Sequence, residues 1–158
     1  MTTRYQPLDK RRSLASAWRG MAHWFGCKLR RSDSYTATID RAGLRFTVPR
    51  DTIFSWHLAK YRAYEAPLTN WIARRVQAAP QGLYVDVGAN FGWYTCVMAR
   101  LCEPGGQVVA FEPADENLRR LRANVADNQL GDRVRIVAQG AARETGTAVL
   151  QDRKGTRL

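Results

Sequence analysis

Between residues 81 and 138, the hydrophobic positions of the chain follow two different periods. Three short stretches are continuously apolar or alternate between apolar and polar residues, which is typical of strands: 83–86, 107–112 and 133–137. Two stretches between them repeat apolar residues every three or four positions, which predicts helices with one apolar face: Trp93, Val97 and Leu101, then Leu118, Leu121 and Val125. This order predicts a β-α-β-α-β unit with a parallel sheet, one half of a doubly wound α/β fold.

The segment before this predicted α/β unit has a different pattern. Residues 34–39 and 44–48 have strand character and flank the turn-like segment 40–43, so they predict a β-hairpin. Pro67 is well placed to begin a helix, because its fixed φ suits the first helical position. We expect this hairpin and helix either to cover a ligand site or to serve as a purely structural cap.

Residues 1–31 form the most basic part of the chain. They contain eight Arg or Lys and one acid, Asp9, whereas the whole 158-residue chain has a net charge of +11. Five apolar residues recur there at helical spacing: Leu14, Trp18, Met21, Phe25 and Leu29. A basic amphipathic helix of this kind docks on a domain with its arginines in solvent, lies on an anionic membrane surface, or binds nucleic acid or another acidic partner. No specific binding of nucleic acid is expected.

The segment Asp86-Val87-Gly88-Ala89-Asn90-Phe91-Gly92 lies between the first strand and the first helix of the α/β unit. Glycines in such a turn allow positive φ angles and close approach of a ligand to the backbone. The free amides of the following helix would face an anionic group. The segment therefore predicts a loop that binds a nucleotide-like cofactor.

A second acid supports this prediction. Glu112 ends the second strand, 20 residues after Gly92 (112 − 92), where a carboxylate can accept hydrogen bonds from ribose hydroxyls. The loop lacks the three glycines of a dinucleotide fingerprint, since Asn90 replaces the middle one. A nicotinamide-dependent oxidoreductase is therefore the less favoured alternative.

The motifs D-V-G-A-N-F-G-W-Y-T and A-F-E-P, with Tyr64-Glu65 and Asn128-Gln129-Leu130, resemble the FkbM-type methyltransferase family over about residues 60–151. The resemblance implies a Rossmann-like class I fold and transfer of a methyl group from S-adenosyl-L-methionine (SAM), usually to a hydroxyl of a sugar or small metabolite. It also implies a set of cofactor-binding residues. Those for the methionine part and backbone of SAM are Asp86, Gly88, Ala89, Asn90, Phe91 and Gly92, with Glu112 for the ribose and Pro113 near the adenine.

Two further residues are weaker candidates under the same resemblance. Gln139 follows the third strand and would reach the adenine amino group, and Glu65 would close the methionine end or be an exposed acid at a helix start. The chain ends at Leu158, before the family's fourth strand and its acidic motif. We therefore expect an incomplete domain that is weak or inactive alone, either a truncated gene product or one half of an assembly that needs a partner. The sequence identifies neither a catalytic residue nor the methyl acceptor.

These patterns predict three parts: a basic amphipathic arm (1–31), a hairpin and helix cap (32–80) and a truncated SAM-binding domain (81–158). The three cysteines and two histidines lack metal-ligand spacing, so no metal site is predicted. The expected location is the cytoplasm, with the arm as a means of peripheral membrane contact. A non-catalytic module that binds a membrane or acidic partner through this arm is the main alternative to a methyltransferase.

Overall fold

The structure is a computed structural model that describes residues 7, 13–29, 33–39, 43–50 and 52–150. The chain divides into two compact units, Met1–Pro80 and Gln81–Leu158, and each is described by itself.

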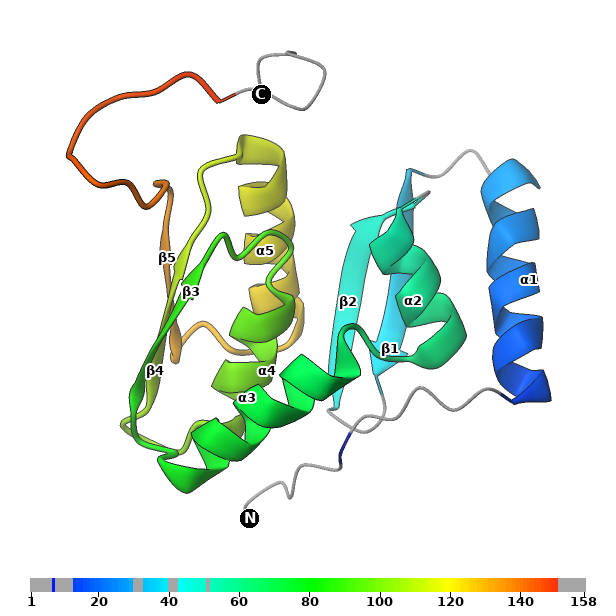
Figure 1. The fold of residues 1–158 in the computed structure, drawn as a ribbon, viewed down its shortest axis with the longest axis horizontal. Coiled ribbons are helices and arrows are strands. Elements are labelled where there is room, and N and C mark those ends of the chain that lie inside the picture. Colours follow the sequence, from blue (N-terminus) through cyan, green and yellow to red (C-terminus); the bar gives the residue numbers. More distant parts are fainter. Residues whose placement is uncertain (1–6, 8–12, 30–32, 40–42, 51, 151–158) are drawn as a thin grey trace. The chain divides into compact units, whose positions relative to one another are not determined.

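The second unit has the predicted order of strands and helices. It consists of β3 (Leu83–Val87), α4 (Trp93–Leu101), β4 (Gln107–Phe111), α5 (Asp115–Asp127) and β5 (Val134–Val137) (Figure 1). The strands form a parallel sheet in the order β3-β4-β5. The α/β prediction with a β-α-β-α-β half is thus confirmed, including the basic helix and hairpin that precede it.

The two faces of this sheet differ. Figure 1 shows α4 and α5 on the same side of the sheet. Val108 and Ala110 of β4 point to one face and are completely buried. On the opposite face, Leu83, Val85 and Val87 of β3 are 69%, 55% and 59% exposed. Parallel sheets are generally covered on both faces, whereas the residues that the structure describes leave this apolar face exposed.

The first unit contains α1 (Leu14–Leu29), the hairpin of β1 (Ser34–Ile39) and β2 (Leu44–Pro49), α2 (Ile53–Tyr61) and α3 (Ala66–Ala78). The hairpin is antiparallel, with Ser34 opposite Pro49 and Ile39 opposite Leu44. The predicted hairpin and the helix with Pro67 in its first turn are confirmed. The predicted turn residues 40–42 lie outside the described residues.

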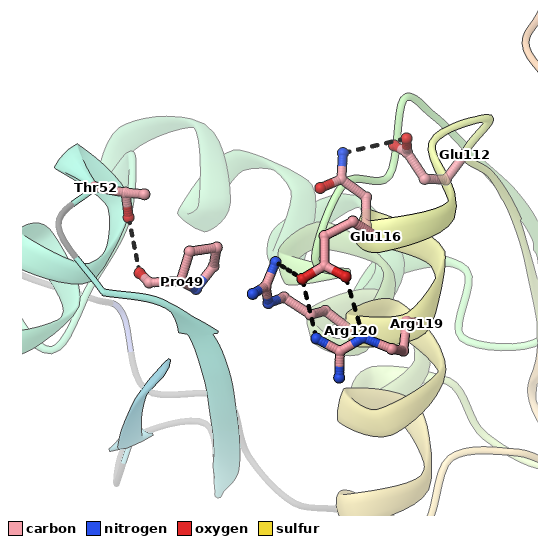
Figure 2. A network of polar contacts seen from close by, with 7 residues as sticks. Pro49, Thr52, Glu112, Glu116, Arg119 and Arg120 are labelled. Atoms are coloured by element: carbon pink, nitrogen blue, oxygen red, sulfur yellow. Dashed lines mark hydrogen bonds and ion pairs between the residues drawn. The ribbon is translucent and has the colours of Figure 1, made fainter. Parts of the chain in front are cut away.

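Helix α2 was not expected from the periodicity. It begins with a capping box, in which the Thr52 hydroxyl accepts a hydrogen bond from the Ser55 backbone amide and the Ser55 hydroxyl accepts one from the Thr52 amide. The Thr52 hydroxyl also donates to the Pro49 carbonyl (Figure 2). The last residue of α2 is Tyr61, and the C-cap residue, Arg62, has a left-handed φ of 54°. A Thr-x-x-Ser sequence was the available signal, although Ser in place of Glu or Gln makes it a weak one.

Helix α1 packs against α2 through its small and polar residues. Ser16, Gly20 and His23 are buried, and a Cβ at Gly20 would lie 3.3 Å from Lys60 Cδ. The apolar stripe is on the exposed side of α1, where Leu14, Trp18, Met21, Phe25 and Leu29 are 88%, 70%, 51%, 54% and 81% exposed. The helix therefore docks as one alternative predicted, but with its apolar side in solvent. None of the described helices has both the length and the hydrophobicity required to cross a bilayer.

Candidate functional site

The segment 86–92 forms a tight turn between the end of β3 and the start of α4. Gly88, Asn90 and Gly92 have left-handed φ angles of 77°, 52° and 85°. Two such positions are glycines, which adopt this conformation without steric cost, and Asn tolerates it better than most residues. The Gly88 and Ala89 amides both donate to the Phe111 carbonyl at 2.9 Å, which fixes the turn to the end of β4.

The two glycines of the turn have different surroundings. A Cβ on Gly92 would lie 2.5 Å from Leu121 Cδ1, so this glycine allows the turn to pack against α5. A Cβ on Gly88 would meet no atom within 4 Å, and Gly88 is exposed. Gly92 is thus needed for packing, whereas the space beside Gly88 is open to a ligand.

Glu112 connects the two strand ends. Its Oε2 accepts a hydrogen bond from the Asn90 amide at 2.8 Å, and its Oε1 accepts from the Ala114 amide at 3.0 Å and from the Asn117 side chain at 3.3 Å. The residue is only 4% exposed. The dashed line at Glu112 in Figure 2 marks this last hydrogen bond, which comes from a side chain of α5. Glu112 therefore holds the turn at residues 86–92 and the start of α5 together in this structure.

Asp86 lies on the covered face of the sheet, at the end of β3. Its Oδ2 accepts a hydrogen bond from the Thr95 hydroxyl of α4 at 2.6 Å. Burial raises the pKa of the Asp86 carboxyl, the Thr95 hydrogen bonds oppose this, and the nearby Glu112 charge raises it further. Two acids therefore lie near each other at the ends of adjacent strands.

Asparagines of α5 support the loop in a way that the sequence did not reveal. The Asn124 side chain, completely buried, donates to the Phe91 carbonyl at 2.8 Å, and the Asn128 side chain donates to the Asn124 carbonyl at 2.7 Å. Asn117 bonds Glu112. Their spacing of four and seven residues along one helix was the available signal. Buried amides with such partners position the loop rather than contact a ligand themselves.

The structure brings the main predicted residues together. Asp86, Gly88, Asn90 and Gly92 share the turn with buried Ala89 and half-buried Phe91, and Glu112 is bonded to it. Pro113 follows Glu112 and is exposed. Gln139 is also exposed, just beyond β5. Glu65 lies in the other unit, at the start of α3, so its role stays a prediction, as does the covering of the ligand site by the hairpin.

These residues fit a nucleoside cofactor with an amino-acid group, with one constraint. A carboxylate has about four acceptor positions, and three are used at Glu112. One ribose hydroxyl could therefore be accepted at Oε2 beside the Asn90 amide. A second would require an existing bond at Glu112 to be released.

A cavity in the described residues lies elsewhere. It has a volume of about 610 Å³ and lies in the first unit, lined by residues such as Arg19, Tyr35 and Arg62. The loop motif and the geometry around Glu112 are a stronger indication of the cofactor site than cavity size, because a loop at the strand ends binds its ligand through backbone approach in an open crevice.

Parts of the chain are similar to known proteins. Residues 86–156 match the family model described as Methyltransferase FkbM domain. No curated protein matches the chain. Among solved structures, a SAM-dependent methyltransferase from Agrobacterium tumefaciens is similar, with 15% identity and a TM-score of 0.54, over 72% of this chain and 34% of the other.

Two further structures resemble the chain less closely in space. One is a methyltransferase from Geobacter sulfurreducens, with 23% identity and a TM-score of 0.45, over 49% of this chain and 40% of the other. The other is the O-methyltransferase TomG from Streptomyces achromogenes, solved with SAM, with 15% identity and a TM-score of 0.45, over 79% of this chain and 51% of the other. The chain thus spans about half or less of the length of these proteins.

At these identities, the Agrobacterium structure supports the fold alone, a Rossmann-like methyltransferase fold of which the chain has a part. The family match covers the turn, Glu112 and all of α5. Residues 86–156 match the model of the Methyltransferase FkbM domain, the family that the motifs of the chain predicted.

Proposed function

We propose that the second unit binds SAM at the ends of β3 and β4 and serves a SAM-dependent methyltransferase reaction. The observation that carries this proposal is the bond between the Asn90 amide and Glu112, which joins the left-handed turn to the acid at the end of the next strand. It is supported by the family match, which covers both residues.

The proposed roles follow from this geometry. Gly88 allows the methionine part of SAM to approach the backbone, since no atom lies where its Cβ would be. Glu112 accepts a ribose hydroxyl, and Pro113 lies beside the adenine. Asp86, held by Thr95, gives the methionine end a negative charge close to the SAM ammonium group. SAM supplies the activated methyl group, and the chain's residues orient it.

The test is a calorimetric titration of the chain with SAM, and with NADH as the alternative cofactor. Glu112→Gln removes one acceptor oxygen and the negative charge, so we expect SAM binding to weaken by about 1–3 kcal/mol. The matched control is Glu116→Gln, four residues further along the chain. Glu116 is exposed, and it contacts Arg119 at 3.0 Å and Arg120 at 2.6 Å (Figure 2).

The control separates a site effect from a general loss of charge. We expect Glu116→Gln to bind SAM as the original chain does, with urea unfolding showing that both variants are folded. Equal weakening in both variants, or stronger binding of NADH than of SAM, would contradict the proposal.

The reaction we propose is O-methylation of a small metabolite or sugar, as the resemblance implies. We propose that the chain alone transfers methyl groups weakly or not at all, because the described face of β3 with Leu83, Val85 and Val87 has no cover that could form an acceptor pocket. Incubation with labelled SAM and a panel of hydroxylated acceptors tests this. Turnover at rates of about 1 per second, common for enzymes, would contradict it.

A second function is favoured by the orientation of α1. We propose that its exposed apolar stripe rests on an anionic membrane surface. Trp18 is 70% exposed, and Lys28 lies 4.2 Å from the Trp24 ring, an arrangement in which aromatic groups enter the interface while basic groups meet lipid phosphates. Residues 1–31, with eight basic residues and one acid, have the complementary charge.

Sedimentation with vesicles tests the membrane proposal. We expect binding to phosphatidylglycerol-containing vesicles, weak binding to phosphatidylcholine alone, and about a tenfold loss in Trp18→Ala, the scale for one buried aromatic side chain. The control is Trp71→Ala on α3, whose tryptophan is 50% exposed and lies 5.2 Å from the Arg75 guanidinium. Equal losses in both variants, or a dimer in solution that requires Trp18, would contradict the proposal.

A further inference from the structure

The cavity of the first unit is lined by an unusual set of side chains. It has a volume of about 610 Å³, within the range of small-molecule sites. Its lining contains three arginines and no acidic residue. The full set is Arg19, Ala22, His23, Gly26, Ser34, Tyr35, Thr36, Arg50, Ala59 and Arg62.

Each arginine is held in place by a backbone carbonyl. Arg19 donates from Nε and from a terminal nitrogen to the Lys60 carbonyl, at 3.4 and 3.1 Å. Arg50 donates to the Ser34 carbonyl at 3.0 Å, and Arg62 donates to the Thr38 carbonyl at 3.1 Å. A guanidinium has five N–H donors, so Arg19 and Arg62 keep donors beyond these bonds. The three side chains come from α1, the end of the hairpin and the end of α2, so the fold itself brings them together.

The cavity is electropositive as a result. All three arginines lie close enough to Tyr35 to lower the pKa of its phenol, although burial, the larger effect, raises it. Three like charges around one cavity repel one another, and the carbonyls that accept hydrogen bonds from Arg19 and Arg62 are neutral. An anion between them would remove this repulsion, and half-buried guanidinium groups would bind it more strongly than exposed ones do.

We propose that this cavity binds a phosphate monoester carried on a small organic group. Guanidinium groups match phosphate oxygens in both charge and geometry, and a monoester has up to two negative charges for the three arginines. Ser34 and Thr36 also line the cavity, and the Thr36 hydroxyl, which lies 3.0 Å from the Thr47 hydroxyl, has capacity for a further hydrogen bond to a phosphate or ester oxygen. The volume exceeds what a bare phosphate fills, so the carrier group has room beside Tyr35.

Two sources share this chemistry, a soluble metabolite and the headgroup of a lipid such as phosphatidic acid. Glycerol 3-phosphate represents the first in a calorimetric titration. Vesicles with phosphatidic acid, compared with phosphatidylglycerol vesicles of equal surface charge, represent the second. Phosphatidylglycerol carries only a phosphodiester, so the comparison also separates this site from the exposed stripe of α1.

The test variant is Arg19→Gln combined with Arg62→Gln, and the control is Arg74→Gln combined with Arg75→Gln on the exposed side of α3. Both lose two positive charges. We expect the cavity variant to lose at least about tenfold in affinity for the probe that binds, and the α3 variant to change it less than about twofold. Arg62→Lys keeps the charge but not the planar fork of the guanidinium, and it changes the fold least. We expect it to lose an intermediate amount of affinity for the probe.

Each result decides the proposal. Specific loss with glycerol 3-phosphate supports a soluble ligand, and specific loss only with phosphatidic acid vesicles supports a headgroup. Absence of binding to both probes overturns the proposal. Equal losses in the cavity and α3 variants also overturn it, because they would show attraction by net charge alone.

Discussion

Helices α1 and α5 both have an apolar side and a basic side, but α5 buries its apolar side and α1 exposes it. In α5, the apolar residues Leu118, Leu121 and Val125 are buried, and Arg119 is exposed. In α1, the small and polar residues are buried, and the apolar stripe is in solvent. Both helices have an apolar side and a basic side, so the period alone does not determine which side packs inward.

The difference comes from what each helix packs against. The apolar stripe of α5 covers one face of a parallel sheet, and burial of large side chains stabilises this contact. Helix α1 instead meets another helix, α2, where Gly20 and Ser16 permit close approach and His23 contacts the Ser55 hydroxyl at 3.3 Å. A buried stripe identifies a structural helix, and an exposed one identifies a surface available to a partner.

The largest effect is expected from removing leucine side chains at matched places in the two helices. Leu121→Ala in α5 should destabilise the second unit by about 2–5 kcal/mol, because it opens a cavity in the core. Leu14→Ala in α1 should change the free energy of unfolding by less than about 0.5 kcal/mol, since this leucine is 88% exposed. Urea unfolding measures both. A similar cost at both positions would show that α1 is covered as α5 is.

Two glycines provide a smaller test of the same contrast. Gly92→Ala should destabilise the chain by about 1–3 kcal/mol, since its φ of 85° is strained for alanine and the new Cβ would meet Leu121. Gly20→Ala in α1 should be neutral or stabilising by up to about 1 kcal/mol, because alanine favours the helix and the three nearest atoms belong to the flexible Lys60 side chain. Thermal unfolding distinguishes these outcomes. A strong destabilisation by Gly20→Ala would mean that α1 and α2 cannot separate even slightly.

The smallest effect concerns the partly buried acid of the second unit. The pKa of Asp86 is raised on folding, so its contribution to stability is full below its unfolded pKa near 3.8 and is lost as the pH rises through the folded value. Asp86→Asn keeps an oxygen that can accept the Thr95 hydrogen bond. The variant should therefore gain stability relative to the original chain between pH 4 and pH 7.

Unfolding in urea at these two pH values checks the sign. A relative loss of stability at pH 7 would show that the Asp86 charge stabilises the unit. The same variant should bind SAM more weakly, since the proposed role of Asp86 requires its charge.

The second unit was largely predictable from the sequence. Its strands and helices alternate with clear periods, and the turn with Gly88 and Gly92 has few structural alternatives. The position of Glu112 at the end of the next strand followed from counting residues along a parallel sheet. Its bonds to Asn90 and Asn117 did not, because they depend on the separation of loop and helix in space.

The first unit was less predictable for physical reasons. Helix α2 is short and begins with the unusual Thr52 and Ser55 box, so periodicity over nine residues carried little signal. The orientation of α1 depends on small residues that a hydrophobicity pattern does not weigh. The cavity with Arg19 and Arg62 is formed by side chains 43 positions apart (62 − 19), and no local motif reveals such a cluster.

An NMR titration of the isotopically labelled chain with SAM shows directly whether the second unit holds the cofactor. We expect the amide signals of Gly88, Asn90 and Glu112 to shift and those of α1 and α2 to stay unchanged. SAM-induced shifts confined to the first unit, or none in a folded chain, would contradict the assignment of the cofactor site.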